Sequence, residues 1–380
     1  MRFMLSLLLA LAGLATSAQA LEVRFYPGER IYAYELSAAH NTSSVLAHNI
    51  AIINDGVAPV ELRDVTLELM NGDRVLDSRT FGAPELTRFA AGYAPLQAAG
   101  MLDTLAFQFG GAQLLPEGRT LSPDLTLDPG EAIMITSQVF AFGGARDRLR
   151  VRVNDDAGEG AIAIHTGVSQ TIFAFPLRGQ WYNASGATFH THHRWTPMEE
   201  FAFDFVRLGA NGKTHRRTGE RFNDYYAYGE PVFAAAAGRV VAVVSDQHED
   251  ASAMQRPDET IEAYFARLQA DQMTRLAGGA PGIGGNQIII DHGNGEYSFY
   301  GHLRPGSVRV HVGDTVERLQ QIGAVGSSGN STEPHLHFHV CNAPELLMCA
   351  GIPVRFEQLD IVIPDPPRQP QSGDFLRPLQ

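Results

Sequence analysis

The chain has 380 residues, 44% of them hydrophobic, and a formal net charge of −13 at pH 7, with Lys213 as its only lysine. This length is sufficient for two domains with hydrophobic cores of their own. An acidic balance without basic runs argues against a nucleic-acid partner.

Residues 1–20 have the pattern of a secretory signal peptide. Arg2 is followed by an apolar run over residues 4–15 and by the small-residue sequence Ala18-Gln19-Ala20. A membrane anchor needs about 18 or more continuous apolar residues, and this run is shorter. We therefore expect cleavage, export to the periplasm or the extracellular space, and no transmembrane segment in the mature chain.

Short alternating runs separated by turn residues predict an all-β, sandwich-like accessory domain over residues 21–175. A helix is expected near Glu85–Ala91. This region has no cluster of His, Cys or paired carboxylates, so we expect a binding or positioning role for it. The predicted strands are Glu22–Tyr26, Ala47–Ile53, Val60–Leu69, Ala132–Phe140 and Leu149–Val153.

A second β-domain is predicted over residues 176–356. The segment Pro231–Ser245 resembles a hairpin with its turn at Gly238, and an Asn-Gly turn predicts another hairpin. The strands of this second hairpin are Asn286–Asp291 and Tyr297–Leu303, and shorter strands are expected at Val308–Val312, Val316 and Ile322–Val325.

Residues 247–285 interrupt this β-pattern. Apolar residues at helical spacing predict a helix over Glu259–Leu276, followed by a glycine-rich run. The insert is either a lid over a binding groove or a packing element. Residues 357–380 are rich in proline and polar residues, so we expect an exposed tail.

Three histidines recur at every second residue in the sequence EPHLHFHV, which spans residues 333–340. In a strand, His335, His337 and His339 would share one face, while the apolar residues between them pack on the other. A face made of imidazoles indicates metal or proton chemistry. The alternative is a half-buried strand with its histidines towards solvent.

Other candidate ligands lie upstream. Asp204 stands in the apolar run 201–206, where a carboxylate is costly unless it is paired or binds a metal. A salt bridge is the structural alternative. Histidines cluster at residues 190–193, and His302 follows a predicted strand. Catalytic zinc takes three ligands from His, Asp or Glu and leaves a position for water, so this inventory fits a hydrolytic zinc centre.

Four stretches in this order resemble the lysostaphin/LytM-type zinc metalloendopeptidases: GEPVFAAAAGRVVAV, GNQIIIDHGNGEYSFYGHL, VHVGDTV and IGAVGSSGNSTEPHLHFHV. The resemblance covers about residues 176–356 and implies a LytM-like antiparallel sheet that binds one zinc ion. It implies that His337 and Asp204 are zinc ligands and that His302 and His335 are the catalytic histidines. The implied substrate is the peptide part of peptidoglycan, cut at a cross-bridge or stem amide.

The chain departs from the family at the first zinc ligand. The usual spacing places a histidine four residues before Asp204, but Glu200 occupies that position. We assign the ligand to His193, with His192 and then Glu200 as alternatives. His339 replaces a glutamate found in many relatives, and we expect it to support a ligand rather than to bind zinc.

Cys341 and Cys349 are the only cysteines, and in an exported protein a close pair predicts a disulfide. Zinc thiolates are the competing interpretation. Two alternatives to a peptidoglycan peptidase stay open: a non-catalytic relative that binds cell wall or regulates another hydrolase, and a zinc peptidase that cleaves proteins.

Overall fold

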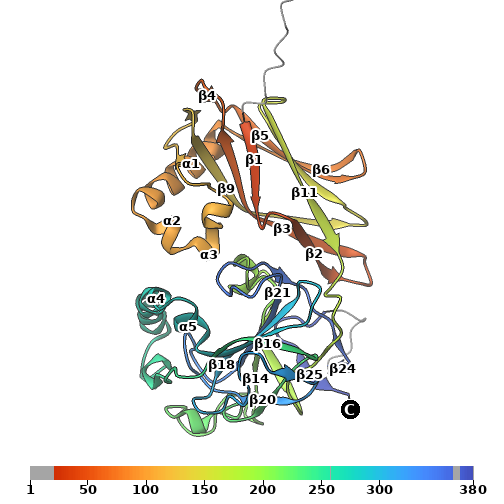
Figure 1. The fold of residues 1–380 in the computed structure, drawn as a ribbon, viewed down its shortest axis with the longest axis vertical. Helices are drawn as coiled ribbons and strands as arrows, with labels where there is room; N and C mark the ends of the chain where they lie inside the picture. Colours follow the sequence, from red (N-terminus) through yellow and green to blue (C-terminus); the bar gives the residue numbers. More distant parts are fainter. Residues whose placement is uncertain (1–20, 257, 363–368, 380) are drawn as a thin grey trace, which may run out of the picture.

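The computed structural model describes residues 21–256, 258–362 and 369–379 and consists mainly of β-strands (Figure 1). The expected signal peptide, residues 1–20, lies outside the described residues. Among the residues described, no helix is long and apolar enough to cross a membrane.

The N-terminal half is built on a nine-stranded sheet with the order β6-β5-β10-β11-β2-β3-β9-β7, in which β1 also pairs with β3. Side chains from both ends of this sheet share one core, in which Val45, Leu67 and Val151 are fully buried. The strands are β1 (Leu21–Tyr26), β2 (Arg30–Ser37), β3 (Thr42–Asn54), β5 (Asp64–Asn71), β6 (Arg74–Gly82), β7 (Thr120–Leu121), β9 (Glu131–Gly143), β10 (Arg148–Val153) and β11 (Gly158–Thr166), and a separate pair is formed by β4 (Val60–Glu61) and β8 (Thr126–Leu127).

Three helices lie beside this sheet, namely α1 (Ala83–Ala98), α2 (Met101–Thr104) and α3 (Ala106–Phe109) (Figure 1). The helix expected near residue 85 is confirmed, and it is longer than predicted. Pro84 stands in its first turn, where the missing N–H costs nothing. A 3₁₀ helix, η1 (Gly111–Gln113), follows them.

The C-terminal half contains a ten-stranded sheet with the order β19-β16-β17-β18-β21-β14-β13-β25-β24, in which β22 pairs with β21. Its core includes Phe173 and Phe175, which precede the boundary expected at residue 176. The strands are β13 (Trp181–Ser185), β14 (Phe203–Val206), β16 (Gly238–Val244), β17 (Asn286–Asp291), β18 (Tyr297–Leu303), β19 (Thr315–Val316), β21 (Leu336–Cys341), β22 (Gly351–Ile352), β24 (Leu359–Ile361) and β25 (Phe375–Pro378), and shorter pairs are β12 (Phe173–Ala174) with β23 (Phe356–Glu357) and β15 (Pro231–Phe233) with β20 (Gln321–Ala324).

The hairpin of β17 and β18 is confirmed, but the hairpin predicted over Pro231–Ser245 is wrong. Its two strands do not pair with each other, because β15 pairs with β20 and β16 pairs with β17 and β19. The strand expected at Val308–Val312 is also absent from these described residues, although Val310 is buried. The segment Pro231–Ser245 does contain two strands, but they have other partners, and in Val308–Val312 the side chain of Val312 is 62% exposed.

The C-terminal segment is not simply an exposed tail. β25 pairs with β13 and β24, and Leu376 is fully buried in the core of the C-terminal half. The expectation of an exposed end is therefore wrong for these strands. Residues 363–368 lie outside the described residues.

The predicted insert contains α4 (Ile261–Ala277), which confirms the expected helix, and α5 (Gly279–Gly284), a short helix within the glycine-rich run that was not predicted. Thr260 caps α4, because its hydroxyl accepts a hydrogen bond from Ala263 N. The insert packs on the glycine-rich loop that precedes β21. Arg275 Nη1 donates to Gly329 O at 2.6 Å, and Asn330 N donates to Ile283 O at 2.9 Å.

Strand β21 runs between β18 and β14 in the middle of the C-terminal sheet. Leu336, Phe338 and Val340 are fully buried in the core, which places His337 and His339 on the opposite face. Burying an apolar side chain of this size contributes about 1.5–3 kcal/mol, so the register is strongly determined. The alternation along β21 therefore places both imidazoles on one face of the sheet, as predicted. That face is also buried.

Candidate metal centre

Asp204 is the point at which three histidines from two segments meet, His193 from one and His335 and His337 from the other. In the β14–β21 ladder it is the direct partner of His337, and Asp204 Oδ1 lies 3.0 Å from His337 Nδ1. Asp204 Oδ2 lies 3.3 Å from His193 Nε2, and Oδ1 lies 3.3 Å from His335 Nε2. The carboxylate therefore sits among imidazoles, as the sequence analysis expected.

The donor set fits zinc. Ligand atoms at the usual 2.0–2.1 Å from a tetrahedral zinc ion stand roughly 3.3 Å from one another. The distances from Asp204 to the facing nitrogens of His193 and His337 are close to this value. Two imidazole nitrogens and one carboxylate oxygen are also the ligand types that zinc takes in catalytic sites.

His193 is better placed than its rivals for the first ligand. Its side chain is only 1% exposed and its ring centroid is 5.1 Å from that of His337, whereas His192 is exposed. His193 begins the 3₁₀ helix η2 (His193–Trp195). Glu200 binds His48 and Arg194 instead of facing the cluster.

The electrostatics favour a neutral His193 beside an ionised Asp204. Burial lowers the pKa of His193 to about 3, although the Asp204 carboxylate opposes this shift. Burial would raise the pKa of Asp204, but the neighbouring imidazoles of His193 and His335, with hydrogen bonds from His335 and His337, hold it well below its usual range. Metal ligands need to be deprotonated, and both groups meet that requirement.

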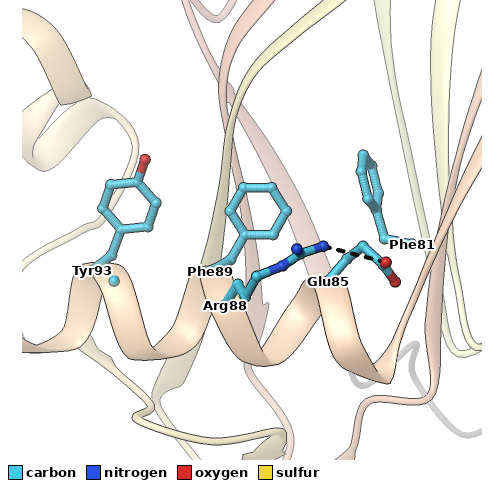
Figure 2. A pocket seen from close by; sticks show the side chains of 6 residues that line it. Phe81, Glu85, Arg88, Phe89 and Tyr93 are labelled. Carbon is cyan, nitrogen blue, oxygen red and sulfur yellow. Dashed lines mark hydrogen bonds and ion pairs between the residues drawn. The ribbon is translucent and has the colours of Figure 1, made fainter.

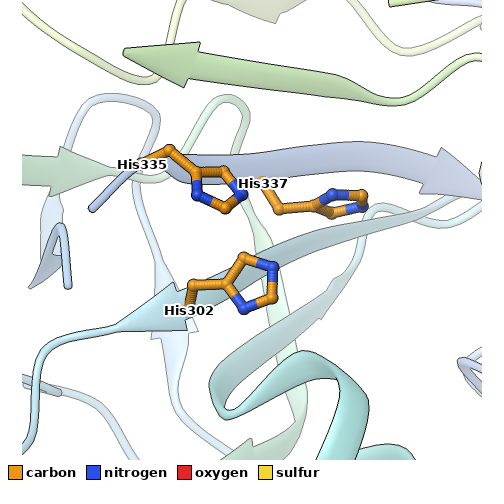
Figure 3. Close-up of side chains that lie close together, drawn as sticks. All are labelled: His302, His335 and His337. Atoms are coloured by element: carbon orange, nitrogen blue, oxygen red, sulfur yellow. The ribbon is translucent and has the colours of Figure 1, made fainter. Parts of the chain in front are cut away.

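His302 and His335 are held in one tautomer by backbone carbonyls. His302 Nδ1 lies 2.8 Å from Ser328 O, and His335 Nδ1 lies 2.8 Å from Glu333 O. A carbonyl can only accept, so each Nδ1 carries the proton. Nε2 of His302 is the nitrogen left for chemistry, whereas Nε2 of His335 lies 3.3 Å from Asp204 Oδ1. Figure 3 shows the rings of His302 and His335 close together, with His337 beside them, and the two ring centroids are 4.7 Å apart.

The two imidazoles differ in basicity. Burial, together with nearby His335 and His337, lowers the pKa of His302 well below its ordinary value. Burial would also lower the pKa of His335, but the charge of Asp204 and its hydrogen bond raise it instead. Divergent environments for paired titratable groups are typical of acid and base roles.

The backbone at His302 is in a strained conformation. Its φ of +59° lies in the left-handed region, which is uncommon for a residue other than glycine and costs on the order of 1–3 kcal/mol. The close approach of the glycine-rich loop supports this conformation: a Cβ at Gly329 would lie 2.3 Å from Gly285 N. This packing brings Ser328 O to His302.

His339 supports His337 rather than joining the ligands. His339 Nδ1 lies 2.9 Å from His337 Nε2, and its ring stacks on Phe299 with centroids 4.8 Å apart. Burial, with smaller contributions from His337 and His193, lowers the pKa of His339 well below its ordinary value. A hydrogen bond to the second nitrogen of a ligating histidine fixes its orientation.

The expected disulfide is present between Cys341 and Cys349, eight residues apart. It lies beside His339, since both sulfur atoms and a ring nitrogen of His339 fall within 4.8 Å of one another. A disulfide sulfur carries no thiolate charge, so zinc binding by these cysteines is not the arrangement found.

Sequence reasoning missed the groups that hold the predicted site residues. Ser328 and Glu333 act through main-chain oxygens, which no motif reveals. Arg194 is fully buried and forms an ion pair with Glu200. The only available signal was that Arg194 directly follows His193 in a cluster of histidines.

Cavities also lie outside the histidine cluster. In the N-terminal half, a cavity of about 470 Å³ lies along α1, where Figure 2 shows Phe81, Phe89 and Tyr93 beside the paired Glu85 and Arg88. It offers no unpaired titratable side chain for catalysis. A polar cavity of about 610 Å³ lies next to the histidines, and its lining includes Lys213, Arg217, Arg256, Tyr264 and Glu333.

Comparison with known proteins gives the chain a family context. Residues 218–347 match the model of "Peptidase family M23". The resemblance to the lysostaphin/LytM-type enzymes is thus confirmed for a segment that holds His302, His335 and His337. His193 and Asp204 lie before it.

A 72-residue stretch is 40% identical to peptidoglycan DD-endopeptidase ShyA of Vibrio cholerae, covering 18% of this chain and 16% of that protein. A 75-residue stretch is 35% identical to cell division protein DipM of Caulobacter vibrioides, covering 20% and 12%. The matches therefore span less than a fifth of these relatives. The catalytic domain of lysostaphin from Staphylococcus simulans aligns over 46% of this chain and 88% of its own, at 20% identity and a TM-score of 0.25.

Proposed function

We propose that this chain, which carries a peptidase family M23 segment, is an exported zinc metalloendopeptidase that hydrolyses peptide bonds in peptidoglycan. One observation carries the proposal: Asp204 lies at ligand spacing from His193 and His337, with His302 and His335 beside them. In this proposal His193, Asp204 and His337 hold one zinc ion per chain.

A zinc ion bound there would supply a water of lowered pKa and polarise the carbonyl under attack. His302 and His335 would handle the protons. Both keep Nδ1 protonated on a backbone carbonyl, so Nε2 of one can accept a proton while Nε2 of the other donates to the developing oxyanion. Their positions, one on β18 and one just before β21, allow them to reach the same reacting group from two sides.

The peptidoglycan substrate is supported by the relatives, two of which are named peptidoglycan DD-endopeptidases. The polar cavity beside Glu333 supports a peptide substrate that carries carboxylates, because Lys213, Arg217 and Arg256 all line it. Export to the periplasm or the extracellular space is the location that such a substrate requires, and the N-terminal sequence pattern supports it.

The test is metal analysis and digestion of purified sacculi by the mature chain, followed by mass spectrometry of the released peptides. We expect about one zinc ion per chain and cleavage at a cross-bridge or stem amide. His337→Ala should abolish both zinc binding and cleavage. His311→Ala is the matched control, because this histidine lies in the same half and its side chain is 92% exposed.

Zinc binding by the wild type without cleavage of sacculi would favour the non-catalytic alternative. Cleavage of an unfolded protein substrate but not of sacculi would favour a general peptidase. Either result would overturn the proposed substrate, and a wild-type chain without zinc would overturn the metal centre.

A further inference from the structure

A buried polar network joins the N-terminal sheet to the segment that carries His193. Arg194 and Ser44 are fully buried, His48 is 2% exposed and Glu200 is 5% exposed. Burying charges without need is costly, and a buried ion pair stabilises a fold only when its geometry and remaining hydrogen bonds are good. A network with so little solvent contact therefore calls for a reason beyond stability.

Arg194 and Glu200, in the C-terminal half, each contact a side chain of the N-terminal half. One oxygen of Glu200 accepts from Arg194 Nη1, and the other lies 2.9 Å from His48 Nε2. Arg194 Nη2 donates to Ser44 Oγ at 3.2 Å. Ser44 and His48 both lie on β3, four residues apart, so they point to the same side of the strand.

A second contact from the N-terminal half reaches the same segment. Gln108 Nε2, from α3, donates to Trp195 O at 2.7 Å. The main-chain carbonyl oxygen of Gln108 accepts from Asn49 Nδ2 at 2.8 Å. The short helix η2, which contains His193, is thus held through two of its own residues, Arg194 and Trp195. Figure 1 shows β3 and α3 on the side of the N-terminal half that faces the C-terminal half.

His193 needs such an anchor because only one of its two ring nitrogens, Nε2, has a partner, namely Asp204. Histidines that bind metals almost always donate their second ring N–H to a carboxylate, a carbonyl or water. Within residues 21–256, 258–362 and 369–379, His193 Nδ1 is buried and has no hydrogen-bond partner. The orientation of the ring therefore depends on the backbone of η2, which Arg194 fixes.

We propose that Ser44 and His48 are positioning residues for the metal centre, so that the N-terminal sheet completes the zinc site in the other half. They act through Arg194 and Glu200 on His193, and the inference rests on the proposed function. It also explains the departure in spacing noted in the sequence. Glu200 occupies the position at which relatives have the first zinc ligand. In this chain it binds Arg194 and so helps to anchor His193, the residue proposed to take over as that ligand.

The experiment measures zinc affinity on the mature full-length chain, stripped of metal and titrated against a chromophoric chelator. We expect His48→Ala and Ser44→Ala to weaken zinc binding by about 10–100-fold, the range observed when groups that orient metal ligands are lost. His48→Gln keeps a donor near Glu200 and should restore affinity close to the wild-type value. The visible absorption of the Co²⁺-loaded protein should change in His48→Ala and return in His48→Gln.

The matched control is Glu68→Gln, which removes a 7%-exposed carboxylate from the ion pair with Arg150 in the same sheet. It should lower the melting temperature without changing zinc affinity. If His48→Ala does not fold, the zinc affinity of Ser44→Ala provides the test. A folded His48→Ala or Ser44→Ala variant with wild-type affinity would overturn the inference alone, as would an equal loss of affinity in Glu68→Gln. A wild-type chain that binds no zinc would overturn the proposed function and this inference with it.

Discussion

Replacing His339 by phenylalanine tests whether the third histidine of β21 supports the zinc ligand. With a cation between His337 Nδ1 and Asp204, the proton of His337 would lie on Nε2 and point at His339 Nδ1, 2.9 Å away. Phenylalanine keeps the stack on Phe299 but removes the acceptor. The Nε2–H of His337, whose side chain is 5% exposed, would then be buried without a partner.

Leaving a buried donor unsatisfied costs about 1–3 kcal/mol, which at about 1.4 kcal/mol per factor of ten corresponds to a roughly 5- to 150-fold loss of zinc affinity. Chelator competition on the metal-free protein measures this loss. His339→Glu is the informative companion, because a carboxylate accepts from His337 Nε2–H and should retain affinity. Wild-type affinity in His339→Phe would refute the reasoning, since the hydrogen bond would then contribute nothing to the ligand.

Four further outcomes are expected. Chelation by EDTA should abolish hydrolysis and added zinc should restore it, whereas His302→Ala should keep its zinc and lose about 10²–10⁴-fold in kcat. Gly329→Ala should lower kcat more than Gly306→Ala. Both glycines have a positive φ, but only a Cβ at Gly329 would meet backbone, at 2.3 Å from Gly285 N. Equal effects of the two substitutions would contradict this reasoning. Replacing Cys341 and Cys349 by serine should cost about 2–3 kcal/mol of unfolding free energy, read from denaturant titration, because the closed loop is short.

The sequence predicted those features that depend on local pattern. Alternation along 336–340 placed the apolar residues in the core, the Asn-Gly turn identified the hairpin of β17 and β18, and helical spacing identified α4. These features need only neighbours in the chain or a turn of defined geometry. The pairing of Asp204 with His337, by contrast, came from the family resemblance, because 133 residues separate them.

The sequence-based errors concern strand pairing, that is, which strand lies next to a correctly identified apolar segment. The segment Pro231–Ser245 has the composition of a hairpin, but Ala234 N donates to Gln320 O and Ala235 N donates to the Tyr300 hydroxyl, which holds the connection away from a tight turn. Periodicity specifies which side chains are buried and leaves the neighbouring strand open. The network of His48 and Glu200 escaped for the same reason, since 152 residues lie between the two.

The glycines before β21 allow close backbone packing beside His302. A narrow groove for small residues would leave the glycines facing open space. Instead, a Cβ at Gly326 would lie 2.4 Å from Arg304 N, and one at Gly285 would lie 2.4 Å from the carbonyl carbon of Ser328. Backbone packs against backbone at these points, and this packing carries Ser328 O to His302. The insert contacts the same loop, because Arg275 Nη1 donates to Gly329 O, so α4 and His302 are both hydrogen-bonded to neighbouring residues of one loop.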